Sequence, residues 1–446
     1  MLLLEKVFQI INDSGLIYCI QNKYEMMPET IPSDIDMMYK DASEEFLDNL
    51  VKRIATETGL IITQKICQGY FEYTYIISYP CPKEYFQLQL DFYRAISRRG
   101  YLNIMPAEEM LESRRYYKCF YVPDPYIEFK YMWIRRTIKH DMNMEHIAIA
   151  KDLYSRNPDA YMERLKQDLG EEAAELALEI IKKNDYKIFN DNFEVFNRAA
   201  KKISRNNATL KIRVKYAIFM VKTVIPKRIF HKCGLSVAFI APDGAGKSTV
   251  INRVKETVSG SFYGVNLYYM RPHLFKNLGH YNKLNPTEEA TSNNDPHAVI
   301  CDGPFKSALR FFFYNFDYLL GTLLKVSRKK IAKQLVIFDR YYYDYFADMK
   351  RYKYSLPSWF PLAFKWMIPK PDMVFVLDGS PEVLYERKKE LPIEELRRQC
   401  FVFHQLAQKE KNFYLIDVNR DLDAIVDDIT RSILEEVAEQ TARIMK

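Results

Sequence analysis

Hydrophobic and polar positions change their spacing along the chain, and the change separates three regions. In residues 1–130, short β-type runs alternate with helical ones; 61–77 is rich in Ile, Thr and Tyr, and 85–93 alternates between apolar and polar residues, as strands do. Residues 131–225 have few strand signals and a helical period instead, for example at 171–183, whose acidic start and basic end suit a helix dipole. The pattern predicts an α+β domain at 1–130 and a helical connector or subdomain at 131–225.

The third region, residues 226–446, alternates apolar runs with helical stretches. The strand-like runs are 235–240, 265–270, 335–338, 373–377 and 413–418. Continuous apolar runs separated by helices are typical of parallel strands that are buried on both faces. This region is therefore expected to be an α/β domain built on a parallel sheet.

The strongest chemical signal is a glycine-containing loop between a strand and a helix. Residues 235–249 read L-S-V-A-F-I-A-P-D-G-A-G-K-S-T, which matches G-x-x-x-x-G-K-[ST] except that Ala241 replaces the first Gly. The replacement is tolerable if the backbone of Ala241 keeps a negative φ. Successive backbone N–H groups in such a loop, followed by a helix N-terminus, form a concave site for phosphate.

This loop predicts binding of ATP with Mg²⁺. Lys247 is expected to bridge the β- and γ-phosphates, and the Ser248 hydroxyl to ligate Mg²⁺. The residues expected to hold the nucleotide are Asp243, Gly244, Ala245, Gly246, Lys247, Ser248 and Thr249.

A second element, residues 335–341, reads L-V-I-F-D-R-Y. Four apolar residues place Asp339 at the carboxyl end of a buried strand, where ligands of open α/β sheets gather. Asp339 is expected to hold Mg²⁺ through water, and Arg340 to present its guanidinium group to a phosphate. For Tyr341 we keep two interpretations of equal weight, a wall of the substrate cleft and simple packing.

A third element follows the strand that ends at Asp378. Pro381 suits the first turn of the next helix, and that helix carries Arg387 toward a segment able to close over transferring phosphates. The alternative interpretation is a basic helix end that only satisfies the helix dipole.

Together these motifs resemble the thymidylate kinase family over residues 235–434. The resemblance is carried by P-D-G-A-G-K-S-T, by D-R-Y and by P-D-M-V-F-V-L-D-G-S-P-E-V followed by Arg387. It implies that Asp243 lies near the acceptor hydroxyl or the metal and that Arg340 holds the acceptor phosphate. It also implies a phosphate-positioning role for Arg271 and a lid role for Arg387.

The chain departs from this family around the acceptor. Family members usually read R-E-P-G-G after the second strand, whereas this chain reads R-P-H-L-F-K, and the family's arginine in the helix before D-R-Y falls near Asp317 or Tyr318. We therefore expect a kinase-type phosphotransferase that acts on a small anionic or hydroxylated acceptor, with thymidylate less well supported.

A carboxylate pattern near the N-terminus predicts a metal site. In P-S-D-I-D-M-M-Y, Asp34 and Asp36 would project from one face of a strand, and Asp91 in L-Q-L-D-F-Y is a third candidate ligand for Mg²⁺. The set resembles the polymerase-β-like nucleotidyltransferase superfamily, in which three carboxylates bind two metal ions. The Gly-Ser pair usual in that superfamily is absent; the substitute contacts would be Gln21, Asn22 and Lys23. An exposed acidic turn is the alternative.

The whole arrangement resembles proteins of bacterial capsule and surface-polysaccharide clusters. Three other hypotheses stay open: a bifunctional kinase and nucleotidyltransferase in surface-polysaccharide precursor synthesis, a nucleotide-sensing protein that barely hydrolyses, and a nucleic-acid end kinase.

The net charge of the chain weakens the hypothesis of a nucleic-acid end kinase. Of the 446 residues, 65 are Lys or Arg and 58 are Asp or Glu, so the formal net charge is +7. The excess is mild, no concentrated basic stripe is expected, and the run Lys201, Lys202 and Arg205 is interpreted as a solvated face. The expected partner is a small-molecule phosphate acceptor and not nucleic acid; a homodimer stays open.

Cysteine usage and hydropathy indicate the compartment. The seven Cys are scattered singly without a C-x-x-C pair, which favours a reducing, cytoplasmic location. The most apolar stretch, 308–326, is interrupted by Arg310, Asn315 and Asp317, so it is expected to be a buried helix and not a membrane span.

Overall fold

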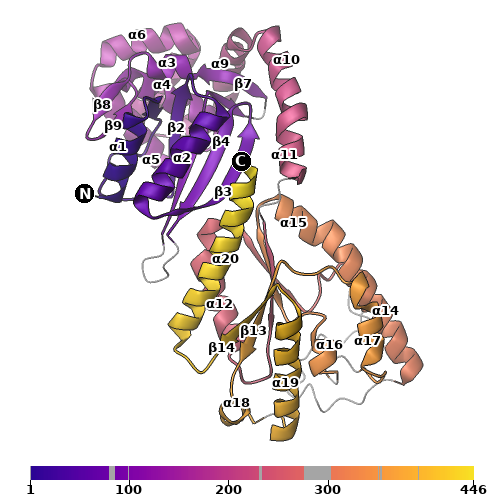
Figure 1. Ribbon diagram of the computed structural model, residues 1–446. Coiled ribbons are helices and arrows are strands. Elements are labelled where there is room, and N and C mark those ends of the chain that lie inside the picture. The colour runs from indigo at the N-terminus through magenta and orange to yellow at the C-terminus, as the bar shows by residue number, and fades with distance from the viewer. Residues whose placement is uncertain are drawn as a thin grey trace. The chain divides into compact units, whose positions relative to one another are not determined.

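The computed structural model divides the chain into two compact units (Figure 1). The first takes in Met1–Ile77 and Leu88–Lys227, and the second Ser78–Gln87 and Arg228–Ile444. The structure describes residues 2–79, 86–98, 100–230, 234–275, 303–349, 351, 354–389 and 391–445, with side chains 228–230 left out. Each unit has its own sheet and its own core, so each is described by itself.

The sheet of the first unit places the predicted carboxylate pattern on neighbouring strands. Its five strands, within the described residues, are β1 (Ile17–Ile20), β2 (Asp34–Lys40), β3 (Ile61–Gly69), β4 (Glu72–Ser78) and β5 (Gln87–Tyr93), in the order β1-β2-β5-β4-β3. β2 runs antiparallel to β1 and parallel to β5, and Asp36 lies opposite Asp91 in that register. Two antiparallel pairs complete the strands: β6 (Ala95–Arg98) with β7 (Tyr101–Pro106), and β8 (Arg115–Tyr117) with β9 (Phe120–Val122).

Most helices of the first unit share a hydrophobic core with its strands. They are α1 (Leu3–Asp13), α2 (Glu44–Thr58), α3 (Ala107–Leu111), α4 (Pro125–Lys139), α5 (Met144–Ser155), α6 (Pro158–Leu169), α7 (Glu171–Lys183), α8 (Lys187–Asp191), α9 (Phe193–Asn207), α10 (Leu210–Phe219), a π-helix (Met220–Val224) and α11 (Ile225–Phe230). Asp124 caps α4 and Pro125 suits its first turn. Trp133 of α4 stacks on Phe196 of α9 at 5.7 Å, in a cluster that also contains Met38 of β2. The region predicted as a connector thus packs against the strands that precede it.

The second unit has the parallel sheet that the apolar runs predict. Its strands are β10 (Ser236–Ile240), β11 (Val265–Tyr269), β12 (Leu335–Asp339), β13 (Met373–Asp378) and β14 (Phe413–Asp417), each within one residue of the predicted run. Over the described part of the chain their order is β11-β12-β10-β13-β14, and every neighbouring pair is parallel. The predicted α/β fold of this region is confirmed.

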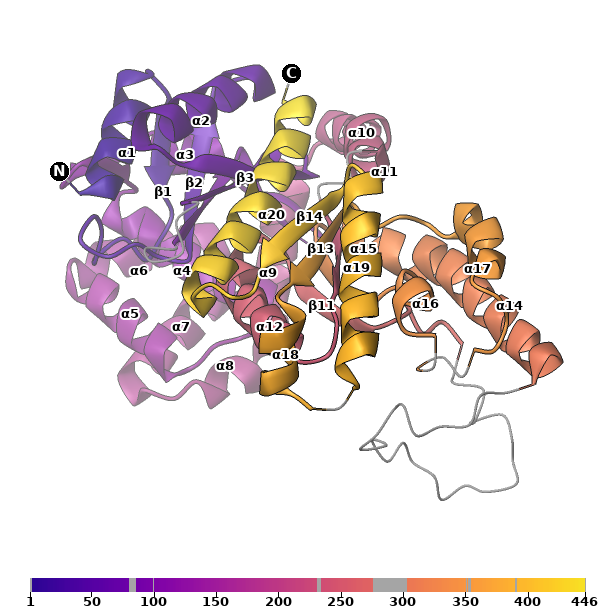
Figure 2. The ribbon, with the colours of Figure 1, turned by 60° about the horizontal axis from the view of Figure 1, so that its bottom comes forward.

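Helices cover both faces of this sheet (Figure 2). Val237 and Phe239 of β10 face a cluster with α12 (Lys247–Val258) and α20 (Leu422–Ile444), whereas Ala238 and Ile240 face a cluster with α14 (Pro304–Gly321). The described residues of this unit also form α15 (Ser327–Ile331), α16 (Asp344–Ala347), α17 (Trp359–Phe364), α18 (Pro381–Arg387) and α19 (Ile393–Lys409), with short π- or 3₁₀-turns at Ser259–Ser261, Thr322–Val326 and Lys365–Met367. Burial on both faces explains why the strands read as continuous apolar runs.

The most apolar stretch forms α14 and the π-turn after it, but the prediction that it is buried is wrong for its outer face. Phe311 and Tyr318 are 0% and 1% exposed, whereas Leu309, Phe316 and Leu323 are 61%, 52% and 58% exposed. No helix among the described residues combines the length and apolarity needed to cross a bilayer.

Candidate functional site

The loop between β10 and α12 has the backbone geometry of a phosphate-binding loop. Gly244 and Gly246 adopt φ of +86° and +73°, in the left-handed region that favours glycine. A Cβ atom on Gly244 would lie 2.7 Å from the carbonyl oxygen of Leu384, so the loop also needs glycine here for space. Ala241 is fully buried and keeps a negative φ, so alanine can replace the first glycine of the motif without backbone strain. The helix begins at Lys247, and its free N–H groups therefore face the loop.

Lys247 of the loop and Asp339 of the neighbouring strand form an ion pair. Asp339 ends β12 beside Phe239 of β10, and its Oδ1 is the atom that pairs with the Nζ of Lys247. Burial and the nearby Arg340 guanidinium lower the pKa of Lys247, while the carboxylates of Asp344 and Asp243 act in the opposite direction. Ser248 follows in the first turn of α12 and is exposed. The structure thus pairs Lys247 with Asp339 and places Ser248 directly after Lys247 in the helix.

Asp243 lies at the centre of a buried charge network. Its two oxygens accept hydrogen bonds from Arg340 Nη2 and Arg351 Nη2, both at 2.6 Å. Arg340 Nη1 also donates to Asp344 at 2.9 Å, and Arg351 Nε to Asp348 at 2.7 Å. Arg340 is 4% exposed and adopts φ +71°. Sequence reasoning missed Arg351. The available signal was the interval of four residues from Arg340 to Asp344 and from Asp344 to Asp348, which is the spacing of side chains that interact along a helix.

Arg271 is held by the residue that departs from the family pattern. Its Nη1 donates to Oδ2 of Asp317 at 2.7 Å, and Asp317 is 0% exposed. The same carboxylate accepts the backbone N–H groups of His273 and Phe275 at 3.0 and 2.8 Å. Asp317 therefore fixes both the Arg271 side chain and the chain segment after β11.

The other two predicted residues have different surroundings. Tyr341 is 1% exposed and its hydroxyl donates to the carbonyl of Pro369 at 2.6 Å, so the packing interpretation describes its position. Arg387 is exposed at the end of α18 and donates to the carbonyl of Val418 at 3.3 Å. Because α18 also contacts Gly244 through Leu384, Arg387 lies on an element that touches the loop.

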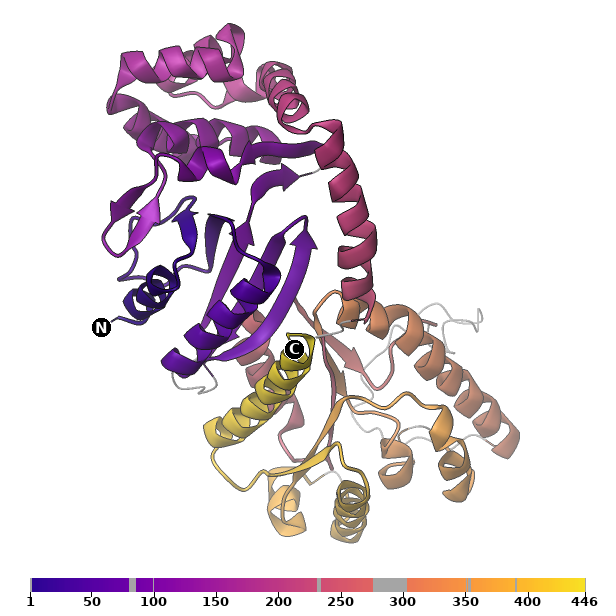
Figure 3. The same cartoon turned by 45° about the horizontal axis from the view of Figure 1, so that its top comes forward.

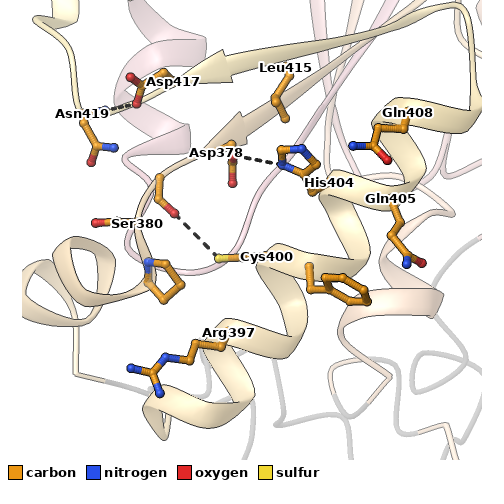
Figure 4. A pocket seen from close by; sticks show the side chains of 13 residues that line it. Asp378, Ser380, Arg397, Cys400, His404, Gln405, Gln408, Leu415, Asp417 and Asn419 are labelled. Atoms are coloured by element: carbon orange, nitrogen blue, oxygen red, sulfur yellow. Dashed lines mark hydrogen bonds and ion pairs between the residues drawn. The ribbon is translucent and has the colours of Figure 1, made fainter.

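A pocket of about 690 Å³ opens beside this region at the carboxyl ends of β13 and β14 (Figure 4). The lining residues come from those strand ends and from α18 and α19: Asp378, Gly379, Ser380, Pro381, Arg397, Cys400, Phe401, His404, Gln405, Gln408, Leu415, Asp417 and Asn419. His404 Nδ1 lies 3.4 Å from Asp378 Oδ2 across it. No residue of the loop 243–249 lines this pocket, and no sequence motif predicted it.

In the first unit, the three predicted carboxylates converge. One oxygen each of Asp34, Asp36 and Asp91 lies within 4.8 Å of the other two. Asp91 is 4% exposed and accepts hydrogen bonds from Thr74 Oγ1 and from Gln89 Nε2, the latter at 2.8 Å. Burial raises the pKa of Asp91 to about 6, and the two neighbouring carboxylates add to the shift. Oxygen donors at these separations fit a divalent cation such as Mg²⁺.

These carboxylates share a pocket of about 390 Å³ with cationic side chains. Arg135 Nη1 donates to Asp36 Oδ2 at 3.2 Å, and Arg98 and Lys139 line the same pocket. Burial lowers the pKa of Lys139, and the positive charges of Arg135, Arg136 and Arg98 contribute in the same direction. Sequence reasoning missed Arg135 and Lys139 because they lie on α4, distant in sequence from the carboxylates, and it also missed Arg98 of β6.

The predicted substitutes for the missing Gly-Ser pair are partly at this pocket. Gln21 lines it and accepts the Tyr131 hydroxyl at 2.6 Å, and Asn22 Nδ2 lies 3.4 Å from Asp36 Oδ2. Lys23 does not line the pocket.

Comparison with known proteins agrees with the geometry of the second unit. The model of the thymidylate kinase family matches residues 242–429, from the loop after β10 into α20. No curated protein matches the chain. The match, the parallel sheet and the loop agree with one another, so residues 242–429 are similar to the thymidylate kinase family.

Proposed function

We propose that the second unit is an ATP- and Mg²⁺-dependent phosphotransferase that transfers the γ-phosphoryl group to a small anionic or hydroxylated acceptor. The observation that carries the proposal is the loop 243–249, whose two left-handed glycines precede a helix that begins at Lys247 beside Asp339. The family match over 242–429 supports it. Enzymes catalyse phosphoryl transfer by positioning the reactants and stabilising charge more than by covalent catalysis. The loop 243–249, with Lys247 and Asp339, supplies both in this proposal.

In this proposal the Lys247 ammonium leaves Asp339 and binds the β- and γ-phosphates. Asp339 and the Ser248 hydroxyl would then hold Mg²⁺, since both offer the oxygen donors that Mg²⁺ prefers. Bound Mg²⁺ would neutralise negative charge on the polyphosphate. Arg387, on the helix that contacts Gly244, would stabilise charge on the transferred group.

The acceptor is proposed to be something other than thymidine monophosphate. The buried pairing of Arg271 with Asp317 supports this, since a carboxylate stands where the resemblance implies an acceptor-contacting arginine. Asp243, Arg340 and Arg351 would bind the acceptor, through a hydroxyl or through a phosphate that exchanges for a carboxylate partner.

The test is ADP release screened against nucleoside monophosphates, sugars and sugar phosphates. One acceptor class should stimulate release, and Lys247→Ala should lower that release by roughly 10²–10³-fold because it removes a charge that contacts the transferred group. The matched control is Lys255→Ala, an exposed lysine on the same helix, which should leave the rate unchanged. ADP release stimulated by thymidine monophosphate alone would contradict the proposed acceptor class. ATP binding without acceptor-dependent release would favour a nucleotide sensor.

We propose a nucleotidyltransferase activity as a second function, located in the first unit. Its support is the convergence of Asp34, Asp36 and Asp91 in a pocket that also contains Arg98 and Lys139. The carboxylates would hold Mg²⁺, and the cations would bind the polyphosphate of a nucleoside triphosphate. Nucleotidyl transfer would release pyrophosphate, and the context would be surface-polysaccharide precursor synthesis.

Pyrophosphate release from each nucleoside triphosphate tests this second activity. Asp36→Asn should abolish it, because the variant removes a carboxylate from the metal site. Asp41→Asn, a change at an exposed position close by, should not. Equal pyrophosphate release from the two variants would contradict the proposed site.

A further inference from the structure

The helical run 210–230 exposes an aliphatic stripe. Leu210, Val214, Ile218, Val221 and Ile225 recur at intervals of three or four residues, which places them on one face of a helix. They are 77%, 49%, 49%, 64% and 47% exposed. Figures 1 and 3 show the run as one long helix, drawn in rose. This aliphatic stripe is a large apolar feature for a solvent-facing helix.

The opposite face of the same run is packed. Tyr216 and Phe219 lie 6.1 and 5.3 Å from the ring of Tyr70, and Phe219 lies 5.1 Å from that of Phe71. These aromatic contacts, at the β3–β4 turn, fix which face of the helix turns inward. Packing of the helix therefore does not account for the aliphatic stripe on its outer face.

Positive charge is concentrated around the stripe. Residues 195–227 contain nine Lys or Arg and no Asp or Glu. Without these nine, 56 of the 65 Lys and Arg residues remain, against 58 Asp and Glu residues. This segment therefore accounts for the net positive charge of the protein. Among the side chains of this helix that the structure describes, the exposed basic ones are Lys211, Arg213, Lys215 and Lys222. The expectation that the charge excess is not concentrated is therefore wrong for this segment.

We propose that the aliphatic stripe docks on an anionic lipid bilayer. The helix would lie in the plane of the surface, with the aliphatic side chains among the lipid headgroups and acyl ends and the lysines on the lipid phosphates. Nucleic acid would use the lysines but would leave five aliphatic side chains in water. If a second copy of the chain docked on the aliphatic stripe, Lys211, Lys215 and Lys222 would lie close to the same lysines of that copy, and the like charges would repel.

Co-sedimentation of the full chain with vesicles tests the proposal. Vesicles of phosphatidylcholine with about 30% phosphatidylglycerol should bind the protein, and pure phosphatidylcholine vesicles should bind it far less, since the lysines need anionic headgroups. The double variant Ile218→Ser/Val221→Ser should reduce binding roughly tenfold, because membrane affinity scales with the apolar area that is buried. Ile149→Ser, at a 46% exposed position on α5, is the matched control and should bind as the unaltered protein does.

A second variant separates charge from apolar contact. Lys211→Gln/Lys215→Gln/Lys222→Gln should also weaken binding to the anionic vesicles, and raised salt should do the same. Vesicle binding that the aliphatic double variant leaves unchanged would overturn the proposal. So would binding of a DNA duplex that only the lysine variant weakens, or a dimer in sedimentation velocity that the serine variant dissociates while vesicles are not bound.

Discussion

Single residues decide the chemistry of the second unit, and Asp243 does so most clearly. Two guanidinium groups converge on its carboxylate, and each is also held by a further aspartate. Such a network is stable only while every charge keeps its partner, because an unpaired charge in a buried position is costly. The network therefore fixes Asp243 at the start of the loop 243–249 and makes the site sensitive to loss of any one member.

Replacing Arg351 by Gln should destabilise the protein. The Arg351 side chain is 10% exposed, and its removal leaves Asp348 and one oxygen of Asp243 without that cation, which should lower the free energy of unfolding by roughly 3 kcal/mol. Urea denaturation followed by intrinsic fluorescence measures this. Arg253→Gln breaks the exposed pair with Asp423 and should cost less than about 1 kcal/mol. Equal effects of the two changes would argue against a buried network.

Metal binding by the first unit should depend on pH through Asp91. Its pKa is raised to about 6, so below that pH the carboxyl group keeps a proton that must leave before it can ligate a metal. Mn²⁺ affinity, measured by calorimetry, should fall by up to about tenfold per pH unit below pH 6 and change little above pH 7. An affinity that stays constant between pH 5 and 7 would contradict the assignment of Asp91 as a ligand.

At the scale of elements, the strand β10, its loop and α12 form one functional unit. The loop changes direction at Gly244 and Gly246, and α18 packs against it so closely that a side chain at Gly244 has no room. Local backbone conformation and tertiary packing therefore both require glycine at position 244.

Gly244→Ala should weaken ATP binding by at least about tenfold, because a residue with a Cβ is strained at φ +86° and would meet the Leu384 carbonyl. Calorimetric titration with ATP and Mg²⁺ measures the effect. Gly303→Ala, where nothing lies within 4 Å of the added carbon, should bind ATP normally. Unaltered affinity in Gly244→Ala would show that the loop can bind phosphate in another conformation.

Prediction from the sequence succeeded where a local pattern determines the structure. The five parallel strands were predicted within one residue because both their faces are buried, and Asp34 and Asp36 were placed on one face because strand side chains alternate. Arg351 was missed because Asp243, which it binds, is distant in sequence, and Lys139 was missed because the carboxylates of its pocket are distant too. The exposed face of α14 was also missed, because an apolar stretch has the same sequence pattern whether or not another element packs against it.

At the scale of the whole molecule, the chain carries two sites in two units. The loop and Asp339 lie in the second unit, and the three carboxylates with their cations lie in the first. Each site draws its described side chains from its own unit, so the two proposed chemistries need not depend on each other.

The two activities should therefore be separable by mutation. Lys247→Ala should lose acceptor-dependent ADP release and keep pyrophosphate release, and Asp36→Asn should do the reverse, because each change removes a charge from one unit only. Both products are measured in parallel on each variant. Loss of both products in both variants, with folding intact by circular dichroism, would contradict two independent sites.

Calorimetric titration with ATP and Mg²⁺ decides whether the loop 243–249 holds a nucleotide polyphosphate. We expect saturable binding at one site that Lys247→Ala weakens by roughly a hundredfold, since a charge-assisted contact to phosphate is lost. Absence of binding, or an unchanged affinity in Lys247→Ala, would contradict nucleotide binding at this loop.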